Sequence, residues 1–266
     1  MLVYPEIDPI AIQIGPISIA WYGIMYLLGF IAAYNLAKIR VQQDWSPLSN
    51  KHIDDLIFYS VIGVILGGRF GYMLFYDSVH LISDPLSWLI ALPQLWNGGM
   101  SFHGGLLGVL CALFIISKRT HQPFISVIDF VAPLVPIGLG LGRIGNFING
   151  ELWGRPTDSV IGFLVQGTPR HATQLYEATL EGLLLFVILW LYTKKKRPSG
   201  FPAALFLITY GCFRIFIEFF RLPDVHIGYL YGGWLTLGHL LTIPMMIFGF
   251  CIIIGCLLYT SDAADE

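Results

Sequence analysis

The chain has 266 residues, of which 56% are hydrophobic and only 12% are charged, and its formal net charge is −2. A soluble domain carries roughly a quarter charged residues, so this composition, with a mean hydropathy of +0.70, excludes an ordinary soluble enzyme. The apolar residues gather in runs of about 20, the helical length that crosses a hydrocarbon core of roughly 30 Å. The sequence therefore predicts an all-α, polytopic integral membrane protein.

Seven apolar runs are long enough to cross a bilayer as helices. They lie at about 18–38, 54–76, 98–117, 124–145, 173–193, 201–220 and 236–258. We expect these seven helices to form one transmembrane domain over residues 1–255. Residues 256–266 are interpreted as the end of the last helix and a non-native tail, because "CLLYTSDAADE" resembles a translated sequencing-library adapter.

The basic residues predict how the chain is oriented in the membrane. Short cytoplasmic loops carry an excess of Lys and Arg. The lysines fall in three places, between the first and second, third and fourth, and fifth and sixth helices: Lys38, Lys51, Lys118, Lys194, Lys195 and Lys196. We therefore expect the N-terminus outside and the C-terminus in the cytoplasm. The first helix is expected to direct insertion itself, because residues 1–15 lack the basic start of a cleavable signal peptide.

Ionisable groups inside the predicted spans form columns on single helix faces. In "YGCFRIFIEFFR", Tyr210, Arg214 and Glu218 follow one another at i+4 steps, and Arg221 lies three residues beyond Glu218. A second column runs along the fifth predicted helix: Gln174, Glu177 and Glu181. Charges at membrane depth are functional-site hypotheses by default. For Arg214 and Glu218, a purely structural ion pair remains an equal alternative.

The stretch "GRIGNFINGELWGR", residues 142–155, ends the fourth predicted span. No acid lies three or four residues from Arg143, so its charge needs a partner from elsewhere. A lipid phosphate is a natural candidate, because a guanidinium group matches phosphate oxygens bidentately. Arg143 and Asn146 share a face if the helix continues that far.

Prolines and glycines interrupt the same span. Pro133 and Pro136 are expected to break the helix. The glycines that follow allow close approach of backbone or ligand: Gly138, Gly140, Gly142 and Gly145. Close packing of helices accounts for the presence of some of these glycines. It does not account for the polar residues Arg143, Asn146, Asn149 and Glu151.

His103 lies in a second glycine-rich stretch, "NGGMSFHGGLLG". A lone histidine on an apolar helix is more often a packing residue. Here the flanking glycines are expected to leave the imidazole accessible, and histidine can accept a proton at neutral pH. His239 has no polar companion at helical spacing, so we assign it a structural role. Tyr22, in "AWYGIMYLLGF", belongs either to an interfacial aromatic belt or to a polar cavity.

Taken together, "GRIGNFINGELWGR", "GGMSFHGGL", "AWYGIMYLLGF", "PRHATQLYE" and "YGCFRIFIEFFR" resemble the prolipoprotein diacylglyceryl transferases of bacteria. The resemblance runs in order over nearly the whole chain. It implies an inner-membrane enzyme that moves diacylglycerol from phosphatidylglycerol to the lipobox cysteine of a prolipoprotein signal peptide. A thioether forms and glycerol phosphate leaves. The partners implied are these two substrates and membrane lipids, with no nucleic acid and no cofactor.

The resemblance also assigns residues. Arg143 matches the phosphatidylglycerol-binding arginine of the family, and His103 matches its essential histidine. The other matched positions are the first-helix tyrosine, the signature residues and the second arginine cluster: Tyr22, Asn146, Glu151, Gly154, Tyr210, Arg214 and Glu218. Between Arg155 and Arg170 the chain is shorter than longer family members, which bears on peptide contacts.

The chemistry of the transfer fits residues found without the resemblance. A thiol is mostly protonated at neutral pH and needs a base, for which His103 is the candidate. Arg143 and Arg214 would neutralise the phosphate as the carbon–oxygen bond breaks. The phosphorus–oxygen bonds survive, so no metal is required.

Other classes of membrane protein fit the sequence less well. A transporter or binder of anionic lipid would also need buried arginines, but the chain shows no internal repeat. An intramembrane serine protease would need a GxSG serine, and Ser101 is followed by Phe102. A metal-dependent phosphatidyl transferase would show several aspartates at helical spacing, which Asp54 and Asp55 do not supply. A purely structural protein would leave His103 and the arginines unexplained.

Overall fold

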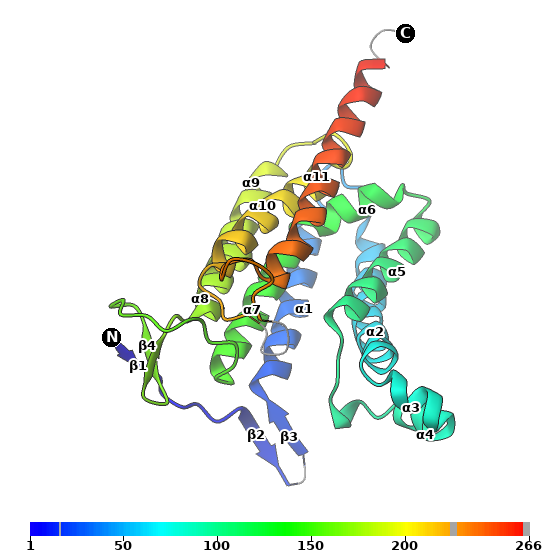
Figure 1. The fold of residues 1–266 in the computed structure, drawn as a ribbon. Coiled ribbons are helices and arrows are strands. Elements are labelled where there is room, and N and C mark those ends of the chain that lie inside the picture. Colours follow the sequence, from blue (N-terminus) through cyan, green and yellow to red (C-terminus); the bar gives the residue numbers. More distant parts are fainter. Residues whose placement is uncertain (16, 224–227, 263–266) are drawn as a thin grey trace. The chain divides into compact units, whose positions relative to one another are not determined.

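The computed structural model describes residues 1–15, 17–223 and 228–262, and most of them are helical. The chain packs as two compact units, which are described separately (Figure 1). The first unit contains Met1–Leu36 and the residues from Asp129 onward, and the second contains Ala37–Ile128. The expected single catalytic domain over residues 1–255 therefore stays a prediction. The last four residues of the proposed non-native tail, 263–266, lie outside the described residues.

Helices long and apolar enough to cross a membrane account for most of the described chain. Six qualify by length and composition, and a bent pair makes a seventh if it is one span. They are α1 (Trp21–Arg40), α2 (Asn50–Phe75), α5 (Phe102–Thr120), the bent pair α6 (Phe124–Val131) and α7 (Val135–Ile148), the continuous run α8–η2–α9 (Thr173–Tyr192), α10 (Phe201–Glu218) and α11 (Leu237–Asp262). The predicted polytopic helical architecture is confirmed.

The fourth predicted span is broken as the prolines suggest. Its two helices, α6 and α7, meet at 49°. Pro136 stands in the first turn of α7, where its missing N–H costs no helical hydrogen bond. Since α7 continues to Ile148, Arg143 and Asn146 lie on the same helix at i+3 spacing, as predicted.

The fifth predicted span is not a uniform α-helix. It consists of α8 (Thr173–Glu177), a π-helical stretch η2 (Ala178–Leu184) and α9 (Leu185–Tyr192). Gly182 of this stretch packs against Gly140 of α7, where an added Cβ would lie 2.6 Å from the Gly140 Cα. Small residues permit such close helix contacts in membranes. The π stretch was not predicted, and such stretches often occur at functional sites.

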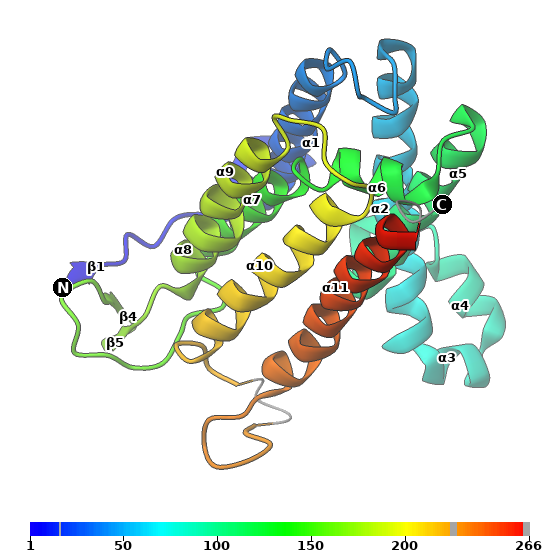
Figure 2. The same cartoon turned by 90° about the horizontal axis from the view of Figure 1, so that it is seen from above.

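In the first unit, α10 and α11 also run side by side (Figure 2). Gly211 of α10 faces Met246 of α11, and an added Cβ would lie 2.3 Å from the Met246 Cγ. The close approach of these helices places the residues that follow α10 beside the first turn of α11. That junction carries part of the polar cluster described below.

Short strands in the first unit depart from the all-α expectation. The strands are β1 (Leu2–Val3), β2 (Ile10–Ile14), β3 (Ile17–Ala20), β4 (Phe163–Val165) and β5 (Thr168–Arg170). They form a sheet in the order β1-β4-β5 and an antiparallel β2–β3 pair. Because β3 occupies residues 17–20, the first helix begins at Trp21, three residues later than predicted.

Tyr4 fastens the N-terminal segment to the end of α7. Its hydroxyl donates to the backbone oxygens of Phe147 and Ile148, at 2.9 and 2.8 Å. Its ring also packs edge-on against Phe147 and Trp153. The last carbonyls of a helix have no partner within the helix, so this side chain satisfies two of them. The N-terminal segment thereby helps to fix the position of the stretch 142–155 at the end of α7.

The second unit is built around the glycine-lined contact of α2 and α5. An added Cβ on Gly108 would lie 1.9 Å from the Gly63 oxygen, and one on Gly104 would lie 2.3 Å from the Gly67 oxygen. No side chain larger than hydrogen fits at these positions. The predicted outer loop between the two helices contains three short helices: α3 (Ser78–Ser83), α4 (Pro85–Ala91) and the 3-10 turn η1 (Leu95–Asn97).

Arg69 of α2 was not singled out from the sequence, although it lies inside a predicted span. It is buried and donates to the backbone oxygens of Ala91, Leu92 and Gly99 at 2.8, 3.2 and 3.3 Å, and also to that of Gly98. These acceptors lie in the segment that leads from α4 to α5. Arg69 therefore has a structural role within the second unit.

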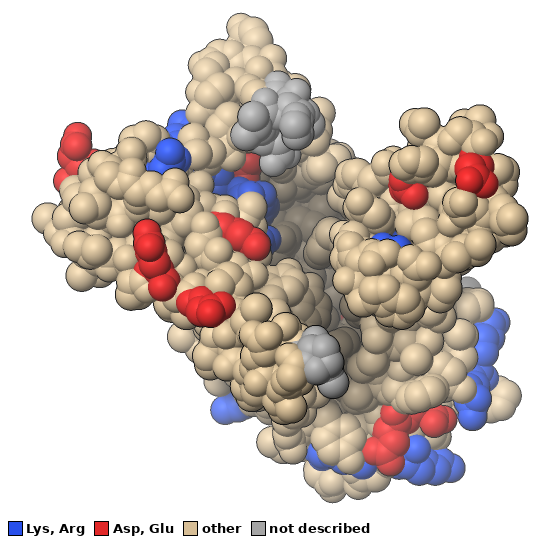
Figure 3. All heavy atoms as spheres, turned by 90° about the horizontal axis from the view of Figure 1, so that it is seen from below, with Lys and Arg blue, Asp and Glu red and all other residues tan. Residues whose placement is uncertain are grey.

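The surface of the protein is largely uncharged. Large apolar side chains are exposed on many helices, among them Leu27, Phe58, Leu66 and Phe248 at about three-fifths of their area. The face shown in Figure 3 is mostly tan, with charged side chains in a few separate groups. Such a surface suits helices that contact acyl chains, which offer no hydrogen-bond partners.

Candidate active site

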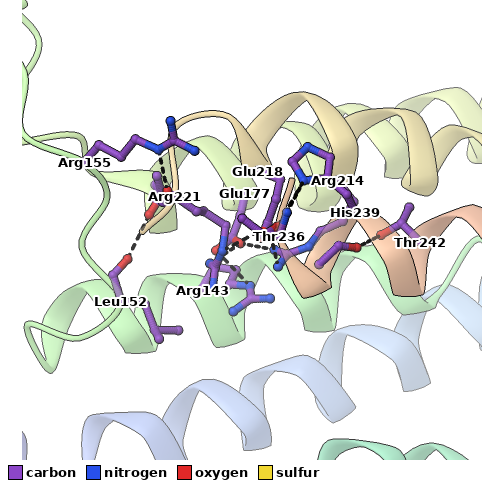
Figure 4. A network of polar contacts seen from close by, with 12 residues as sticks. Arg143, Leu152, Arg155, Glu177, Arg214, Glu218, Arg221, Thr236, His239 and Thr242 are labelled. Atoms are coloured by element: carbon purple, nitrogen blue, oxygen red, sulfur yellow. Dashed lines mark hydrogen bonds and ion pairs between the residues drawn. The ribbon is translucent and has the colours of Figure 1, made fainter. Parts of the chain in front are cut away.

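Three arginines converge on one carboxylate in the first unit (Figure 4). Glu177, the last residue of α8, is completely buried. Its Oε1 lies 2.6 Å from Nη1 of Arg214 and 2.7 Å from Nη1 of Arg221, while its Oε2 lies 3.2 Å from Nε of Arg143. A buried carboxylate of this kind is tolerated only when it is paired. Glu177 thus gathers charges from α7, α10 and the residues after α10.

A second buried acid completes the cluster. Oε2 of Glu218 lies 2.9 Å from Nη2 of Arg214 and 3.4 Å from Nε of Arg221. Its Oε1 accepts a 2.7 Å hydrogen bond from the hydroxyl of Thr236. Gly238 leaves room for this carboxylate, since an added Cβ would lie 2.4 Å from Glu218 Oε1. The predicted i+4 pairing of Arg214 and Glu218 is confirmed, and it belongs to a larger network.

His239 stands at the edge of this network. The expectation that it has no polar companion at helical spacing was wrong, because Thr236 lies three residues earlier and its hydroxyl is 3.0 Å from His239 Nδ1. The backbone N–H of Thr236 also donates to Nδ1, at 3.3 Å. The imidazole therefore satisfies a free N–H at the start of α11, which supports the structural role assigned to it.

Arg143 was expected to need a partner from elsewhere, with a lipid phosphate as the candidate. The structure supplies Glu177, 34 positions further along the chain, as one such partner, and the contact with a lipid phosphate stays a prediction. The contact is an ion pair without hydrogen-bond geometry, since Glu177 Oε2 has no hydrogen-bond partner among the described residues. The Arg143 side chain is 26% exposed, against 16% for Arg214 and 14% for Arg221. Arg143 is therefore the guanidinium in the cluster best able to take a ligand.

The polar residues that follow Arg143 form hydrogen bonds with one another. Asn146 donates to Glu151 Oε2 at 3.2 Å and Asn149 donates to Glu151 Oε1 at 3.3 Å. The side-chain amide of Gln174, at the start of α8, donates to the backbone oxygen of Glu151. Asn146 is buried, whereas Glu151 is exposed. This loop connects Arg143 of α7 to the helix that carries Glu177.

Gly154 has a packing role that the sequence did not reveal. An added Cβ would lie 2.4 Å from the Phe220 oxygen, 2.6 Å from Thr173 Cγ2 and 2.9 Å from His171 Cβ. The backbone around it forms a bridge with Arg221. Arg155 strengthens this contact by donating from its Nε to the Arg221 oxygen at 2.9 Å. Because residue 154 is a glycine, the loop after α7 can pack against the segment that carries Arg221.

Replacing Gly154 by alanine should destabilise the protein. The added methyl group has to move a backbone oxygen, and overpacking of this kind typically costs about 1–3 kcal/mol. We expect a lower midpoint of thermal unfolding in detergent. Gly255→Ala is the matched control, because its Cβ meets no atom within 4 Å of the described residues. Equal midpoints for the two variants would contradict the packing role.

Two tyrosines of the predicted site lie in the same unit. The ring of Tyr22, on α1, packs so closely on α7 that a Cβ on Gly145 would lie 2.9 Å from it. The hydroxyl of Tyr22 is 3.4 Å from that of Tyr26. Tyr210 lies one helical step before Arg214, and its ring stacks on Phe206 with an interplanar angle of 4°. Tyr210 therefore lies on a helix of the arginine cluster, whereas Tyr22 lies on α1, which packs against the α7 helix that carries Arg143.

His103 lies in the second unit, at the second residue of α5. It is exposed and lines a pocket of about 200 Å³ together with Phe75, Tyr76 and Ser101. The expected accessibility of the imidazole is confirmed. Ser101 is buried, and its hydroxyl caps α5 by accepting from the Gly104 N–H at 3.2 Å. That role gives Ser101 a structural explanation.

Most residues of this cluster were predicted from the sequence, but the residue at its centre was not. Glu177 was placed in a polar column without a role, and neither Arg221 nor Thr236 was a predicted site residue. The signal for Glu177 in the sequence is its i+4 spacing from Glu181 inside an apolar run, whereas its contacts with arginines of other helices follow from the fold. Among residues 1–15, 17–223 and 228–262, no group of three or more His, Cys, Asp or Glu is arranged to hold a metal ion. The expectation of a metal-free reaction stays a prediction.

The fold and the cluster define a multi-pass membrane protein with a buried arginine–carboxylate network. Comparison with known proteins identifies its family. The family model described as prolipoprotein diacylglyceryl transferase matches residues 9–255. The chain belongs to this family.

Relatives with similar lengths agree with this assignment. The phosphatidylglycerol–prolipoprotein diacylglyceryl transferase of Oleidesulfovibrio alaskensis is 50% identical over 256 residues, which are 95% of this chain and 94% of that protein. The protein of the same name from Solidesulfovibrio magneticus is 51% identical over 261 residues, covering 95% and 96% of the two chains. That from Coxiella burnetii is 51% identical over 252 residues, covering 94% and 95%.

Proposed function

We propose that this protein transfers the diacylglyceryl group of phosphatidylglycerol to the lipobox cysteine of a prolipoprotein. The product is a thioether and the leaving group is glycerol phosphate, which makes this the first step of lipoprotein maturation. The observation that carries the proposal is the group of three arginines around Glu177, with Arg143 the most exposed. Such a group suits an anionic lipid headgroup. Membership of the family supplies the reaction.

The reaction forms one bond and breaks another at the same carbon. The cysteine sulfur attacks the glyceryl carbon that bears the phosphate, and the carbon–oxygen bond breaks with its electron pair going to the phosphate oxygen. The thiol proton leaves to a base, because thiolate is the effective nucleophile. His103 is the proposed base. It is exposed beside an apolar pocket, where a lipobox cysteine has room to approach.

The arginines stabilise the charge that develops on the leaving phosphate. Arg143 is proposed to contact the phosphate directly through its two Nη groups. Arg214 lies between Glu177 and Glu218, so we expect it to act through its charge in a low-dielectric environment. The other residues proposed to shape the lipid site are Tyr22, Asn146, Glu151, Gly154, Tyr210 and Glu218.

We place the protein in the inner membrane, and the lysine distribution supports an orientation with its N-terminus outside and its C-terminus in the cytoplasm. In this orientation the loop after α7 faces outward and the loop between α9 and α10 faces the cytoplasm. Phosphatidylglycerol and exported prolipoproteins would both reach the site from the outer side.

Cysteine labelling from outside the cell tests this orientation. In a background without the four natural cysteines, a cysteine at Thr157 should react with a membrane-impermeant maleimide. A cysteine at Ser199, which is exposed between α9 and α10, should react only after the membrane is opened. Labelling of both in opened membranes is the control for accessibility. The reverse pattern in intact cells would contradict the proposed orientation.

The proposed activity is tested with membranes that contain the purified protein, phosphatidylglycerol and a lipobox peptide. Mass spectrometry should detect a peptide heavier by one diacylglyceryl group, and the adduct should resist hydroxylamine as a thioether does. A peptide whose cysteine is replaced by serine should remain unmodified. If the peptide stays unmodified while labelled phosphatidylglycerol changes leaflet, the protein is a lipid transporter instead.

A further inference from the structure

We propose that Glu177 is the internal counter-charge that makes the phosphate site reversible. It holds the three guanidinium groups together before lipid arrives and competes with the phosphate product for them afterwards. This inference rests on the proposed transferase function. It assigns Glu177 a positioning and product-release role, in which the residue acts through the arginines and does not contact the reacting atoms.

The two oxygens of Glu177 are used unequally. Oε1 accepts short hydrogen bonds from Arg214 and Arg221, at 2.6 and 2.7 Å. Oε2 faces Arg143 at 3.2 Å and has no hydrogen-bond partner among the described residues. Charge-assisted hydrogen bonds are about twice as strong as neutral ones. Glu177 therefore fixes Arg214 and Arg221 firmly and holds Arg143 loosely, so a phosphate can displace it from Arg143 alone.

Glu177 differs in its contacts from the other acids of the cluster. Glu218 pairs with Arg214 and Arg221 and is also held by Thr236. Glu181, one helical step after Glu177, is buried in the π-helical stretch, and its Oε1 has no hydrogen-bond partner among the described residues. Among the described residues, Glu177 is the only acid that forms ion pairs with Arg143, Arg214 and Arg221.

The proposed reaction creates a need for such a counter-charge. Phosphatidylglycerol carries one negative charge on its phosphodiester, whereas a phosphate monoester carries about −1.5 to −2 at neutral pH. Arginines that stabilise the leaving group therefore bind the product more tightly than the substrate headgroup. A buried carboxylate that reclaims Arg143 weakens this binding and favours release.

Glu177→Gln tests the role through product inhibition. The amide keeps the size of the side chain but removes the charge that competes with phosphate. We expect inhibition by added glycerol phosphate to become about tenfold tighter. The kcat should fall because release slows, while the KM for phosphatidylglycerol should stay the same or fall. A merely structural role for Glu177 would raise the KM and weaken inhibition.

Two further variants serve as controls. Asp129→Asn makes the same change at a buried acid that accepts from the N–H groups of Gly200 and Ala203 and that takes no part in the ion pairs around Glu177. It should leave the inhibition constant within about twofold of the wild-type value. The double variant Glu177→Gln with Arg221→Gln restores the net charge and should bring the inhibition constant back toward wild type. Two purely structural lesions would instead add.

The outcomes separate this inference from the proposed function. If the wild-type protein forms no thioether, the function is wrong. If it does and Glu177→Gln leaves product inhibition unchanged, only the role of Glu177 is wrong. If Glu177→Gln fails to fold, the inference is tested by product inhibition of the single variant Arg221→Gln. Removing one competitor for Glu177 strengthens its hold on Arg143, so inhibition by glycerol phosphate should weaken severalfold, and an unchanged inhibition constant would overturn the inference.

Discussion

Arg143→Ala should abolish diacylglyceryl transfer while the protein remains inserted and folded. Arg143 is the most exposed arginine of the cluster, and its ion pair to Glu177 lacks a hydrogen bond. Its donors are therefore available to the phosphate. Loss of one donor to developing negative charge typically lowers kcat by about 10²–10³. The loss of the headgroup contact should also weaken binding of phosphatidylglycerol.

Arg143→Lys should fail nearly as badly as the alanine variant. An ammonium group keeps the charge but cannot offer the two parallel N–H groups of a guanidinium fork. Initial rates with phosphatidylglycerol and a lipobox peptide measure the effect. Arg119→Lys is the matched control, since this exposed arginine of α5 pairs with Asp55 in the second unit. Near wild-type activity of Arg143→Lys would show that charge alone suffices and that the bidentate geometry is wrong.

The sequence predicted the spanning helices because their signal is local and strong. A run of about 20 apolar residues has few alternatives to a membrane helix. The column of Arg214 and Glu218 was equally predictable, since i+4 spacing places both side chains on one helix face. The break near Pro136 followed from the missing N–H of proline. Each of these inferences needed only neighbouring residues.

The centre of the cluster depends on contacts between elements, which helical spacing does not contain. Arg143 and Glu177 lie on different helices, and the loop that brings them together is held by Gln174 and by the backbone around Gly154. The π-helical stretch after Glu177 also changes which residues share a face. The glycines illustrate the same limit. Gly140 and Gly145 contact other helices closely, whereas an added Cβ on Gly142 would meet no described atom within 4 Å.

His103→Gln should slow the chemical step while leaving binding of phosphatidylglycerol intact. Glutamine is similar in size and still forms hydrogen bonds, but it cannot accept a proton near neutral pH. General-base catalysis typically contributes about 10²–10⁴-fold in rate, so we expect a loss in this range at neutral pH. His80→Gln is the matched control, because His80 is an exposed histidine of the same unit that pairs with Asp77.

The pH dependence distinguishes a base from a residue that only shapes the site. A thiol has a pKa near 8.5, so raising the pH toward that value produces thiolate without help from the protein. The rate of His103→Gln should therefore rise with pH and recover part of the loss, whereas the wild-type rate should change less over the same range. Initial rates from about pH 6.5 to 9 would be measured alongside lipid binding.

A variant that loses binding and rate together, with no recovery at high pH, would make His103 a structural or headgroup residue. The base would then have to be sought among other groups, with Glu151 and Tyr22 the first to test.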